Sequence, residues 1–289
     1  LVIVLGDRFE TFAFVIACYF LNINIAHIHG GELTSGSFDD NIRHSISKLS
    51  NFHFVTHNKY KKRLIQMGEN KKNIFNVGSL GVQNYLNAKK LTKTNLFSRF
   101  NIPQDKKKVL VTFHPETRSN ISYKNQINIF LSSLSSLNNI YFIFTFNNTD
   151  TSGLYFLNQL KKFVKQNKNS MLFNSMGSEL YYSFLKNVDL VVGNSSSGII
   201  EAPSAKTLTL NVGKRQFGRI LSNSIFNSKL NKVEIKKSIL KLLKIKLKKY
   251  NNVYYKKNSK EKIISVIKSK IKKKSSEFKE FFDIKFYDR

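Results

Sequence analysis

Short apolar runs alternate with helical patterns along the first part of the chain. Runs rich in β-branched and aromatic residues predict strands at residues 1–5, 25–30, 52–56 and 74–79. Between them, apolar residues recur at helical spacing over residues 10–21, 39–50, 58–67 and 80–88. Strands that alternate with helices of this length form βαβ units around a parallel sheet. The first part of the chain is therefore predicted to be an α/β domain.

The alternation stops at residues 89–107, which contain Pro103, and then starts again. Further strands are predicted at residues 109–114, 140–146, 171–175, 189–194 and 207–212, with helices near 123–137, 153–167 and 178–186. Lysine-rich helices near 233–248 and 260–282 follow. The pattern predicts two doubly wound α/β domains, which we place at residues 1–95 and 108–250, with a hinge at 96–107 and a basic helical tail at 251–289.

Composition limits the class of protein. A chain of 289 residues is long enough for two cores, and its single cysteine, Cys18, excludes a disulfide framework and a cysteine-based zinc site. The longest apolar run surrounds Cys18 and is too short to cross a bilayer, so we expect a cytoplasmic protein with no membrane contact. Because the chain opens directly in an apolar strand at Leu1, the first domain is expected to be incomplete.

The formal charge of +30 invites a nucleic-acid interpretation, since clustered lysines bind phosphate backbones. Residues 231–289 hold 20 Lys or Arg against six acids, but these are spaced along amphipathic helices. Lysine is also abundant elsewhere in the chain. The distribution indicates solvated helix faces and a general bias in composition, so we do not expect a nucleic-acid partner.

Polar residues gather where the first predicted strands end. Asp7 follows the first strand, and the second carries His27 and His29 on one face before Gly30-Gly31 lead to Glu32. Taken singly, Asp7 could be a helix cap and each histidine a structural residue. Open parallel sheets, however, bind their ligands at these carboxyl ends.

The next predicted helix adds further titratable groups. Asp39 or Asp40 is placed to cap it, Arg43 follows Asp39 by four positions, and His44 follows Asp40 by four. Ordinary salt bridges would explain each pair alone. The accumulation of acids and bases within one short region favours proton transfer, because neighbouring groups can hold their pKa values apart. A metal site is the competing interpretation, since the same side chains are ligands.

The second half carries small and basic residues at its strand ends. His114 ends one strand, and residues 193–205 pass from a strand through Ser195 and Ser196 into a helix predicted to begin at 198–202 with free N–H groups. A helix start with hydroxyl residues suits an anion, although an N-cap with spare serines is the simpler interpretation. Glu201 lies one turn further, and Arg215 follows the next strand with a guanidinium suited to phosphate.

Eight motifs together resemble the hydrolysing UDP-N-acetylglucosamine 2-epimerases of sialic-acid synthesis. They are GDRFE, AHIHGGE, DDNIRHSISK, FHFVT, NVGSLG, the His114-Pro115 pair, GNSSSGIIEAP and KRQFGR, in this order between Leu1 and Arg219. The resemblance implies two Rossmann-like domains of the glycosyltransferase-B type with UDP-sugar in the cleft. It implies loss of UDP and of the C2 proton to form a glycal, then hydration to N-acetylmannosamine. It implies a homo-oligomer, and no cofactor or metal is expected.

The resemblance also assigns roles by position. Asp7 matches a catalytic acid/base carboxylate, and Asp39 matches the acidic position that opens the helix with Arg43 beside it. The residues that match UDP contacts are His114, Ser195, Ser196, Glu201 and Arg215. His29 stands where animal-type relatives have a glutamate, so either His29, whose ordinary pKa lies near 6.5, or Glu32 handles the proton. His27 is expected to pack in the interior.

Three alternatives stay open from the sequence. The same motifs would serve a hydrolysing UDP-N,N′-diacetylbacillosamine 2-epimerase, whose sugar differs at C4 and C6. A non-hydrolysing epimerase matches less well, because HIHGGE and GDRFE resemble the hydrolysing branch. The alternative from another class is a non-enzymatic basic protein that binds nucleic acid and is released by salt.

Overall fold

The computed structural model describes residues 1–146, 153–272 and 279–284, and these form two compact units. Unit 1 comprises Leu1–Gln83 together with Val253–Arg289, and unit 2 comprises Asn84–Asn252. The structure therefore divides the chain before the hinge predicted at 96–107. That stretch overlaps helix α5 (Lys93–Arg99), which packs in unit 2 through buried Leu96 and Phe97.

Unit 1 is built on a four-stranded parallel sheet with the strand order β1-β2-β3-β4. Its strands are β1 (Val2–Leu5), β2 (Ile25–Ile28), β3 (Phe52–Val55) and β4 (Ile74–Asn76). The connecting helices are α1 (Phe9–Phe20), α2 (Asp39–Leu49) and α3 (Asn58–Gln66), followed by the short η1 (Lys71–Asn73) and by α4 (Leu80–Asn87). Each of the four predicted strands and four predicted helices is present.

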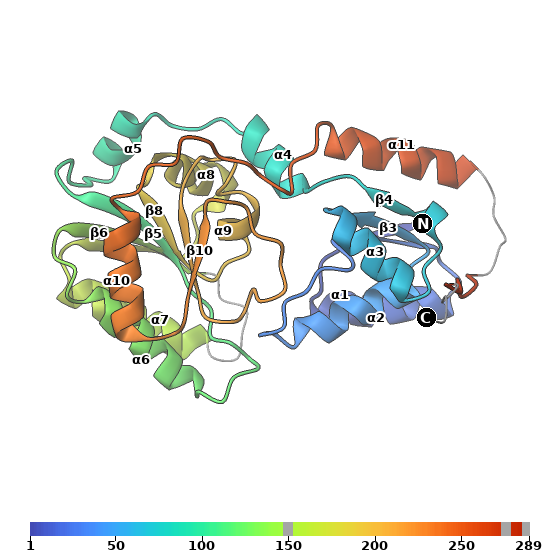
Figure 1. Cartoon of the computed structure of the whole chain (residues 1–289), viewed down its shortest axis with the longest axis horizontal. Coiled ribbons are helices and arrows are strands. Elements are labelled where there is room, and N and C mark those ends of the chain that lie inside the picture. The colour runs from blue at the N-terminus through green and yellow to red at the C-terminus, as the bar shows by residue number, and fades with distance from the viewer. Residues whose placement is uncertain (147–152, 273–278, 285–289) are drawn as a thin grey trace, which may run out of the picture. The chain divides into compact units, whose positions relative to one another are not determined.

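The two faces of this sheet are covered by different parts of the chain (Figure 1). On one face Ile25 packs with apolar residues of α1 and α2. On the other face Phe52 and Phe54 pack with Ile263, Val266 and Ile267 of α11 (Ser259–Lys272). Strand residues alternate between the faces, so each face needs its own cover. The predicted basic tail thus covers one face of the sheet of unit 1.

The C-terminal segment differs from the sequence prediction in a second way. A helix was expected over 260–282, but the helix ends by Lys272 within the described residues, and residues 279–284 are not helical. Residues 273–278 of that prediction lie outside the described residues. Lys279 Nζ donates to the carbonyl oxygens of Lys48 and Ser50 at 2.5 and 2.7 Å, at the end of α2, and pairs with Glu69 at 2.7 Å. A cation is favourable at a helix C-terminus, where carbonyl groups lack partners.

β1 lies at the edge of the sheet and carries exposed apolar side chains. Ile3 and Leu5 are 53% and 60% exposed, whereas Val4 between them is 5% exposed. Among the described strands, only β2 pairs with β1. The alternation shows that one face of β1 is packed against the core and the other is not.

Unit 2 contains a six-stranded parallel sheet with the order β10-β9-β8-β5-β6-β7. The strands are β5 (Lys107–Thr112), β6 (Ile140–Thr145), β7 (Ser170–Phe173), β8 (Leu190–Gly193), β9 (Thr209–Val212) and β10 (Ile225–Ser228). The remaining helices are α6 (Tyr123–Leu134), α7 (Gly153–Gln166), α8 (Gly177–Asn187), α9 (Ser197–Ile200) and α10 (Lys232–Leu242). The sequence predicted all of these strands and helices except β10. It did not predict α5 either.

The strand order of unit 2 is that of a doubly wound Rossmann-like fold. α6, α7 and α10 cover one face, and α5 and α8 cover the other. The chain winds outward from β5 in one direction and from β8 in the other, so the order switches between these neighbours. Ligands of such sheets bind beside the carboxyl ends of the strands at this switch point. The predicted α/β class with two parallel-sheet units is confirmed.

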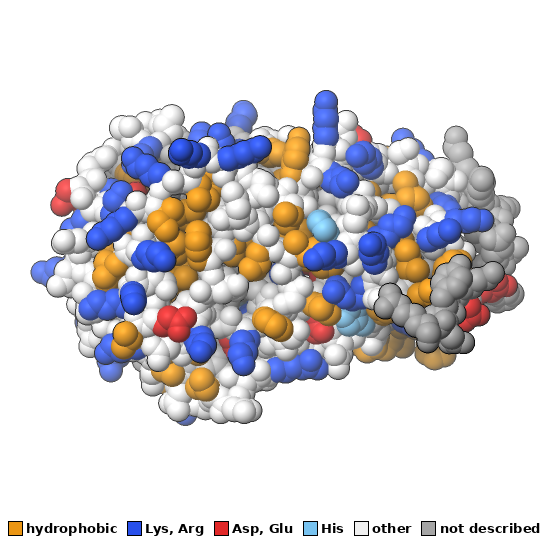
Figure 2. Space-filling view, viewed as in Figure 1, with side chains coloured by type: hydrophobic (Ala, Val, Ile, Leu, Met, Phe, Trp, Pro, Cys, Tyr) orange, Lys and Arg blue, Asp and Glu red, His pale blue; other side chains and the backbone are white. Residues whose placement is uncertain are grey.

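No helix in the described part of the chain combines the length and the apolar character that crossing a membrane requires. Figure 2 shows lysine and arginine side chains spread over the visible face, with apolar and neutral side chains between them. This scatter agrees with a general compositional bias.

Candidate active site

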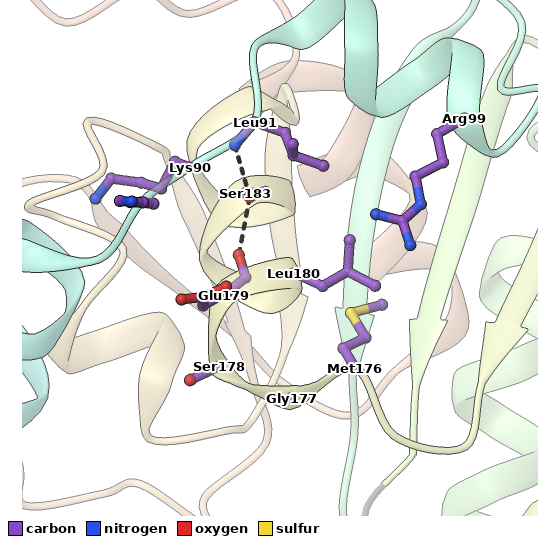
Figure 3. Close-up of a pocket in the computed structure, with 10 residues that line it drawn as sticks. Lys90, Leu91, Arg99, Met176, Gly177, Ser178, Glu179, Leu180 and Ser183 are labelled. Atoms are coloured by element: carbon purple, nitrogen blue, oxygen red, sulfur yellow. Dashed lines mark hydrogen bonds between the residues drawn. The ribbon is translucent and has the colours of Figure 1, made fainter.

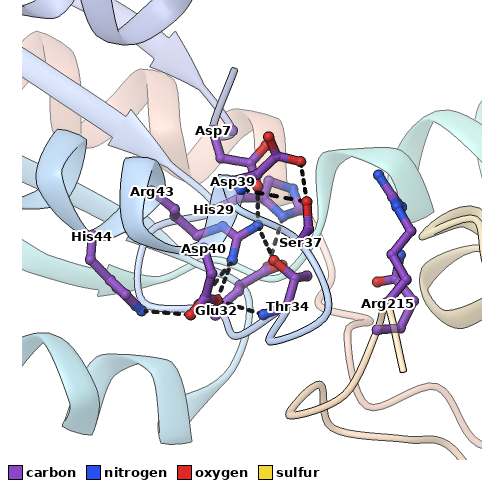
Figure 4. A network of polar contacts seen from close by, with 12 residues as sticks. Asp7, His29, Glu32, Thr34, Ser37, Asp39, Asp40, Arg43, His44 and Arg215 are labelled. Atoms are coloured by element: carbon purple, nitrogen blue, oxygen red, sulfur yellow. Dashed lines mark hydrogen bonds and ion pairs between the residues drawn. The ribbon is translucent and has the colours of Figure 1, made fainter. Parts of the chain in front are cut away.

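Arg43 is the centre of the polar network in unit 1 (Figure 4). Its side chain is 2% exposed and ion-pairs with Asp7 and, at 3.3 Å, with Asp40. It also donates to the hydroxyl of Thr34 at 3.0 Å and to the carbonyl oxygen of Glu32 at 3.1 Å. A buried guanidinium is stable only when its charge and N–H groups are matched in this way. The strand ends of β1 and β2 are thereby tied to α2.

The structure corrects three details of the predicted pairings. Asp7 ion-pairs with Arg43, and Arg8, the residue that caps α1, makes no side-chain capping bond. Arg43 pairs with Asp40 three positions earlier, whereas the sequence pointed to Asp39. Neither aspartate caps α2, whose N-cap is Phe38; Asp40 instead accepts a 2.6 Å bond from the backbone N–H of Thr34. His44 lies 3.8 Å from Asp40, as the spacing predicted.

Asp39 lies at the first position of α2, and its carboxylate accepts a hydrogen bond of 2.7 Å from Ser37. An acidic residue in the first turn is favoured by the helix dipole.

His29 adopts a backbone conformation that the strand pattern did not predict. β2 ends at Ile28, and His29 has φ +70°, in the left-handed region that costs a non-glycine residue on the order of 1 kcal/mol. Strand alternation therefore ends before His29, and the expectation that it shares a face with His27 does not apply. Its backbone N–H still donates to Phe54 at 3.0 Å. Strain of this kind is typical of functional positions.

Glu32 holds the imidazole of His29. Its buried carboxylate accepts hydrogen bonds of 2.8 Å from His29 Nδ1 and of 2.8 Å from Thr56 Oγ1. The loop that joins His29 to Glu32 is itself fixed, because Arg63 donates to the carbonyl oxygen of Gly31. Gly31 has φ +75°, and a Cβ there would lie 2.7 Å from a backbone oxygen of Tyr60, so the turn requires glycine.

His27 is an interior residue, as expected. It is fully buried, donates from Nε2 to the carbonyl oxygen of Gly6 at 2.7 Å and accepts from the hydroxyl of Ser47 at 2.9 Å. Burial lowers the pKa of His27 to about 3, because the charged ring would lose its hydration. His53, opposite it on β3, is also buried with a lowered pKa and bonds to Glu69 at 2.8 Å. The ring of His27 is therefore neutral at physiological pH.

His114 and Asn194 bond to each other at the switch point of unit 2. The backbone N–H of His114 donates to Asn194 Oδ1, and Asn194 Nδ2 donates to the backbone carbonyl oxygen of His114, both at 2.7 Å. Burial, with a smaller contribution from the charge of Arg215, lowers the pKa of His114 to about 3. Asn194 was not singled out from the sequence, although its place directly after a strand was the same signal that identified His114.

Gly193 allows β8 to approach β5 closely. Its φ is +136°, and a Cβ at this position would lie 1.9 Å from the carbonyl oxygen of Thr112. Asn194 then accepts, at its carbonyl oxygen, hydrogen bonds from Arg215 at 3.4 Å and from Gln216 at 2.8 Å. Arg215 is therefore placed beside the same strand end as the serines that follow Asn194.

The helix after these serines is shorter than predicted. α9 spans only Ser197–Ile200, and the N–H groups of residues 198–202 bond to carbonyl oxygens of residues 195–197. The expected free N–H groups therefore cannot come from residues 198–202. Ser195, Ser196 and Glu201 do lie in one compact turn beside the switch point, where the sequence placed them.

Two of the pockets in the described part of unit 2 can be compared with the predicted residues. The first, of about 520 Å³, lies beside α8 and holds none of the predicted residues; its Ser183 bonds to Leu91 and Glu179 (Figure 3). The second, of about 880 Å³, lies where β9 and β10 end, and its lining includes Lys214, Gln216 and Arg219. The second pocket is not lined by the predicted residues either, but its Gln216 bonds to Asn194 beside them. Across the described residues, no three His, Cys, Asp or Glu side chains gather as metal ligands would.

The chain belongs to the UDP-N-acetylglucosamine 2-epimerase family, whose sequence model matches residues 1–268. It is 40% identical to the GDP/UDP-N,N′-diacetylbacillosamine 2-epimerase (hydrolyzing) of Campylobacter jejuni, over 81% of this chain and 61% of the relative. It is 39% identical to the polysialic acid biosynthesis protein P7 of Escherichia coli, over 98% of this chain and 73% of the relative. The chain thus spans less than two thirds of the length of the first of these relatives.

The fold is also that of a solved family structure. UDP-GlcNAc 2-epimerase from Neisseria meningitidis, solved bound to UDP-GlcNAc, aligns with a TM-score of 0.77 and 18% identity over 92% of this chain and 76% of that one. At this identity the similarity establishes the fold alone.

Proposed function

We propose that the protein is a hydrolysing 2-epimerase that converts UDP-N-acetylglucosamine and water to N-acetylmannosamine and UDP. Family membership and the hydrolysing relative support the reaction class. The observation that carries the proposal is the His29–Glu32 pair, in which a buried carboxylate fixes a histidine in a strained turn. A base positioned in this way is what removal of a weakly acidic C2 proton needs.

In the first step, a base on unit 1 takes the proton from C2, and the bond between C1 and the diphosphate oxygen breaks. The electron pair of the C2–H bond becomes the C1–C2 double bond of the glycal, and UDP leaves with the pair of the broken C–O bond. His29 is the proposed base. Because Nδ1 donates to Glu32, Nε2 is the nitrogen that accepts the proton.

Glu32 is proposed to position His29 without touching the sugar, since the carboxylate is fully buried and accepts two hydrogen bonds. This assigns the proton-handling role left open between the two residues. Arg43 is equally buried, so its role is to hold Asp7 in place.

In the second step, water adds its hydroxyl group to C1, and a proton returns to C2 from the opposite face of the ring. Asp7 and Asp39 are the proposed acid–base groups, because they are the least buried carboxylates of the network. Asp7 is 25% exposed at its side chain, compared with 12% for Asp40. A proton delivered to the other face inverts C2 and gives the manno configuration.

Unit 2 is proposed to bind UDP. Arg215 and the turn at Ser195 and Ser196 stabilise the negative charge that develops on the departing diphosphate, and Glu201 contacts the ribose. His114 bonds to the leaving group as a neutral ring, in keeping with its lowered pKa. A cytoplasmic location and a homo-oligomeric state belong to this proposal.

A second candidate substrate is UDP-N,N′-diacetylbacillosamine, which the name of the relative from C. jejuni suggests. Its C1 and C2 undergo the same chemistry, so only groups around C4 and C6 of the sugar would distinguish it.

The test is to incubate the protein with each UDP-sugar in D₂O and to follow the products by NMR. We expect UDP together with the free 2-epimeric sugar carrying deuterium at C2, because the original proton is lost. Absence of UDP release with both sugars would reject the reaction. UDP release without deuterium at C2 would reject the glycal route.

A further inference from the structure

Thr56 lies directly after β3 and is fully buried. Its hydroxyl donates to Glu32 Oε1 at 2.8 Å, the same oxygen that accepts the proton of His29 Nδ1 at 2.8 Å. An ionised carboxylate only accepts hydrogen bonds, so both neighbours must be donors. The three side chains therefore form a chain of hydrogen bonds with a defined direction.

We infer that Thr56 is a positioning residue for His29, which acts by fixing the orientation of the Glu32 carboxylate. This inference rests on the proposed function and adds a residue to it. The residue takes no part in contacts with the sugar, since its side chain is enclosed in unit 1.

Two features make this hydrogen bond more than a stabilising contact. Glu32 is buried, so the hydroxyl of Thr56 replaces water that the carboxylate would otherwise bind. The hydrogen bond from the hydroxyl also reduces the effective negative charge of Oε1, so this oxygen attracts a protonated His29 less strongly. Thr56 therefore influences both the direction of the imidazole and how readily it releases its proton.

The backbone supports the same arrangement. The N–H of His29 donates to Phe54 on β3, two residues before Thr56. The strained turn at His29 is thus held to β3 through its backbone, and its side chain is held to the end of the same strand through Glu32. One strand end fixes both parts of the residue.

Thr56→Val tests the inference, because it replaces the hydroxyl with a methyl group of similar size. We expect kcat to fall about tenfold with KM for the UDP-sugar nearly unchanged. The pH profile of kcat/KM should also change, because the carboxylate that bonds to His29 has then lost the hydroxyl donor. Thr56→Ser, which restores a hydroxyl, should recover both values.

A matched control is Thr207→Val, which removes a buried threonine hydroxyl that donates to Leu185 at 2.7 Å in unit 2. It should lower Tm without moving the pH profile. If Thr56→Val lowers only Tm and leaves kcat and the profile of the wild-type protein, Thr56 is structural and the inference is wrong.

NMR of ¹⁵N-labelled histidine separates this inference from the reaction itself. In the free wild-type protein, His29 should show a protonated Nδ1 when neutral, and Thr56→Val should change the populations of its two tautomers. This result would support the role of Thr56 even if neither UDP-sugar reacts. Unchanged His29 resonances in the variant would overturn it even if the protein is an active epimerase.

Discussion

The charged side chains near the strand ends of unit 1 pair with one another, whereas the strand ends of unit 2 combine neutral groups with cations such as Arg215. Arg43, Asp7 and Asp40 satisfy each other within the protein. In unit 2, Gln216 has a buried Oε1 with no hydrogen-bond partner among the described residues, and His114 is a neutral ring. The charges at the centre of the network in unit 1 are thus matched within the protein, while the Oε1 of Gln216 in unit 2 is not. Acid–base chemistry needs groups that are held in place in this way.

Arg43→Met should give the largest contrast, when compared with Arg215→Met in unit 2. Loss of the buried guanidinium leaves Asp7 and Asp40 without their shared cation, and we expect the free energy of unfolding to fall by about 3–5 kcal/mol. Arg215 is only partly buried, so its replacement should cost about 1 kcal/mol or less. Urea unfolding of both variants measures this. Equal losses would show that the two units do not differ in this way.

Asp7→Asn should separate turnover from binding. We expect kcat to fall about 1000-fold, equivalent to about 4 kcal/mol, while the Kd for UDP measured by calorimetry stays within about threefold of the wild type. Arg215→Met should instead weaken binding and raise the Kd for UDP by about 10- to 100-fold, since a charged hydrogen bond is lost. Substantial turnover in Asp7→Asn would remove Asp7 from the mechanism.

Thr56→Val and Thr112→Val compare two buried hydroxyl groups at strand ends. Thr56 bonds to a buried carboxylate, and its loss should destabilise unit 1 by about 1–3 kcal/mol. Thr112 Oγ1 lies near the hydroxyl of Tyr181 but makes no bond with hydrogen-bond geometry, so Thr112→Val should leave stability within about 1 kcal/mol of the wild type. Thermal unfolding measures both, and a large loss in Thr112→Val would contradict the description of unit 2.

Acid should act on both units alike, through His27 and His114. The pKa of each is lowered from an ordinary value of 6.5 to about 3, so between these pH values the unfolded chain binds a proton that the folded protein does not. Stability therefore falls as pH falls through this window, by up to about 1.4 kcal/mol per pH unit for each ring. His27→Gln and His114→Gln should each reduce the slope of unfolding free energy against pH. A slope unchanged in both variants would show that these rings titrate normally.

Strand and helix positions were readable from the sequence wherever apolar periodicity was strong, as in β2, β3, β5 and β6. β10 was missed because its four residues include Asn227 and Ser228, which interrupt the apolar pattern. α5 was missed because the stretch around it has weak periodicity and ends near Pro103. The packing of α11 on unit 1 could not be read at all, since it depends on contacts between residues far apart in the chain.

The candidate site was readable as a set of residues but not as a set of contacts. The positions of Asp7, His29 and Glu32 after strands correctly indicated that they lie together. Asp7 and Glu32 contact Arg43, and His29 contacts Glu32. The left-handed turn at His29 was hidden, because an apolar strand pattern continues up to it. Thr56 was overlooked although it too ends a strand, since a threonine carries no charge to draw attention. Which carboxylate meets which base depends on backbone geometry that local pattern does not contain.

The cover that α11 gives to the sheet of unit 1 has a consequence for biosynthesis. On the ribosome, all of unit 2 is translated between β4 and α11, so Phe52 and Phe54 emerge long before their packing partners. Unit 2 can complete its own core during that interval, since domains fold as units while the chain is being made. The nascent chain therefore presents one uncovered sheet face until α11 has been translated.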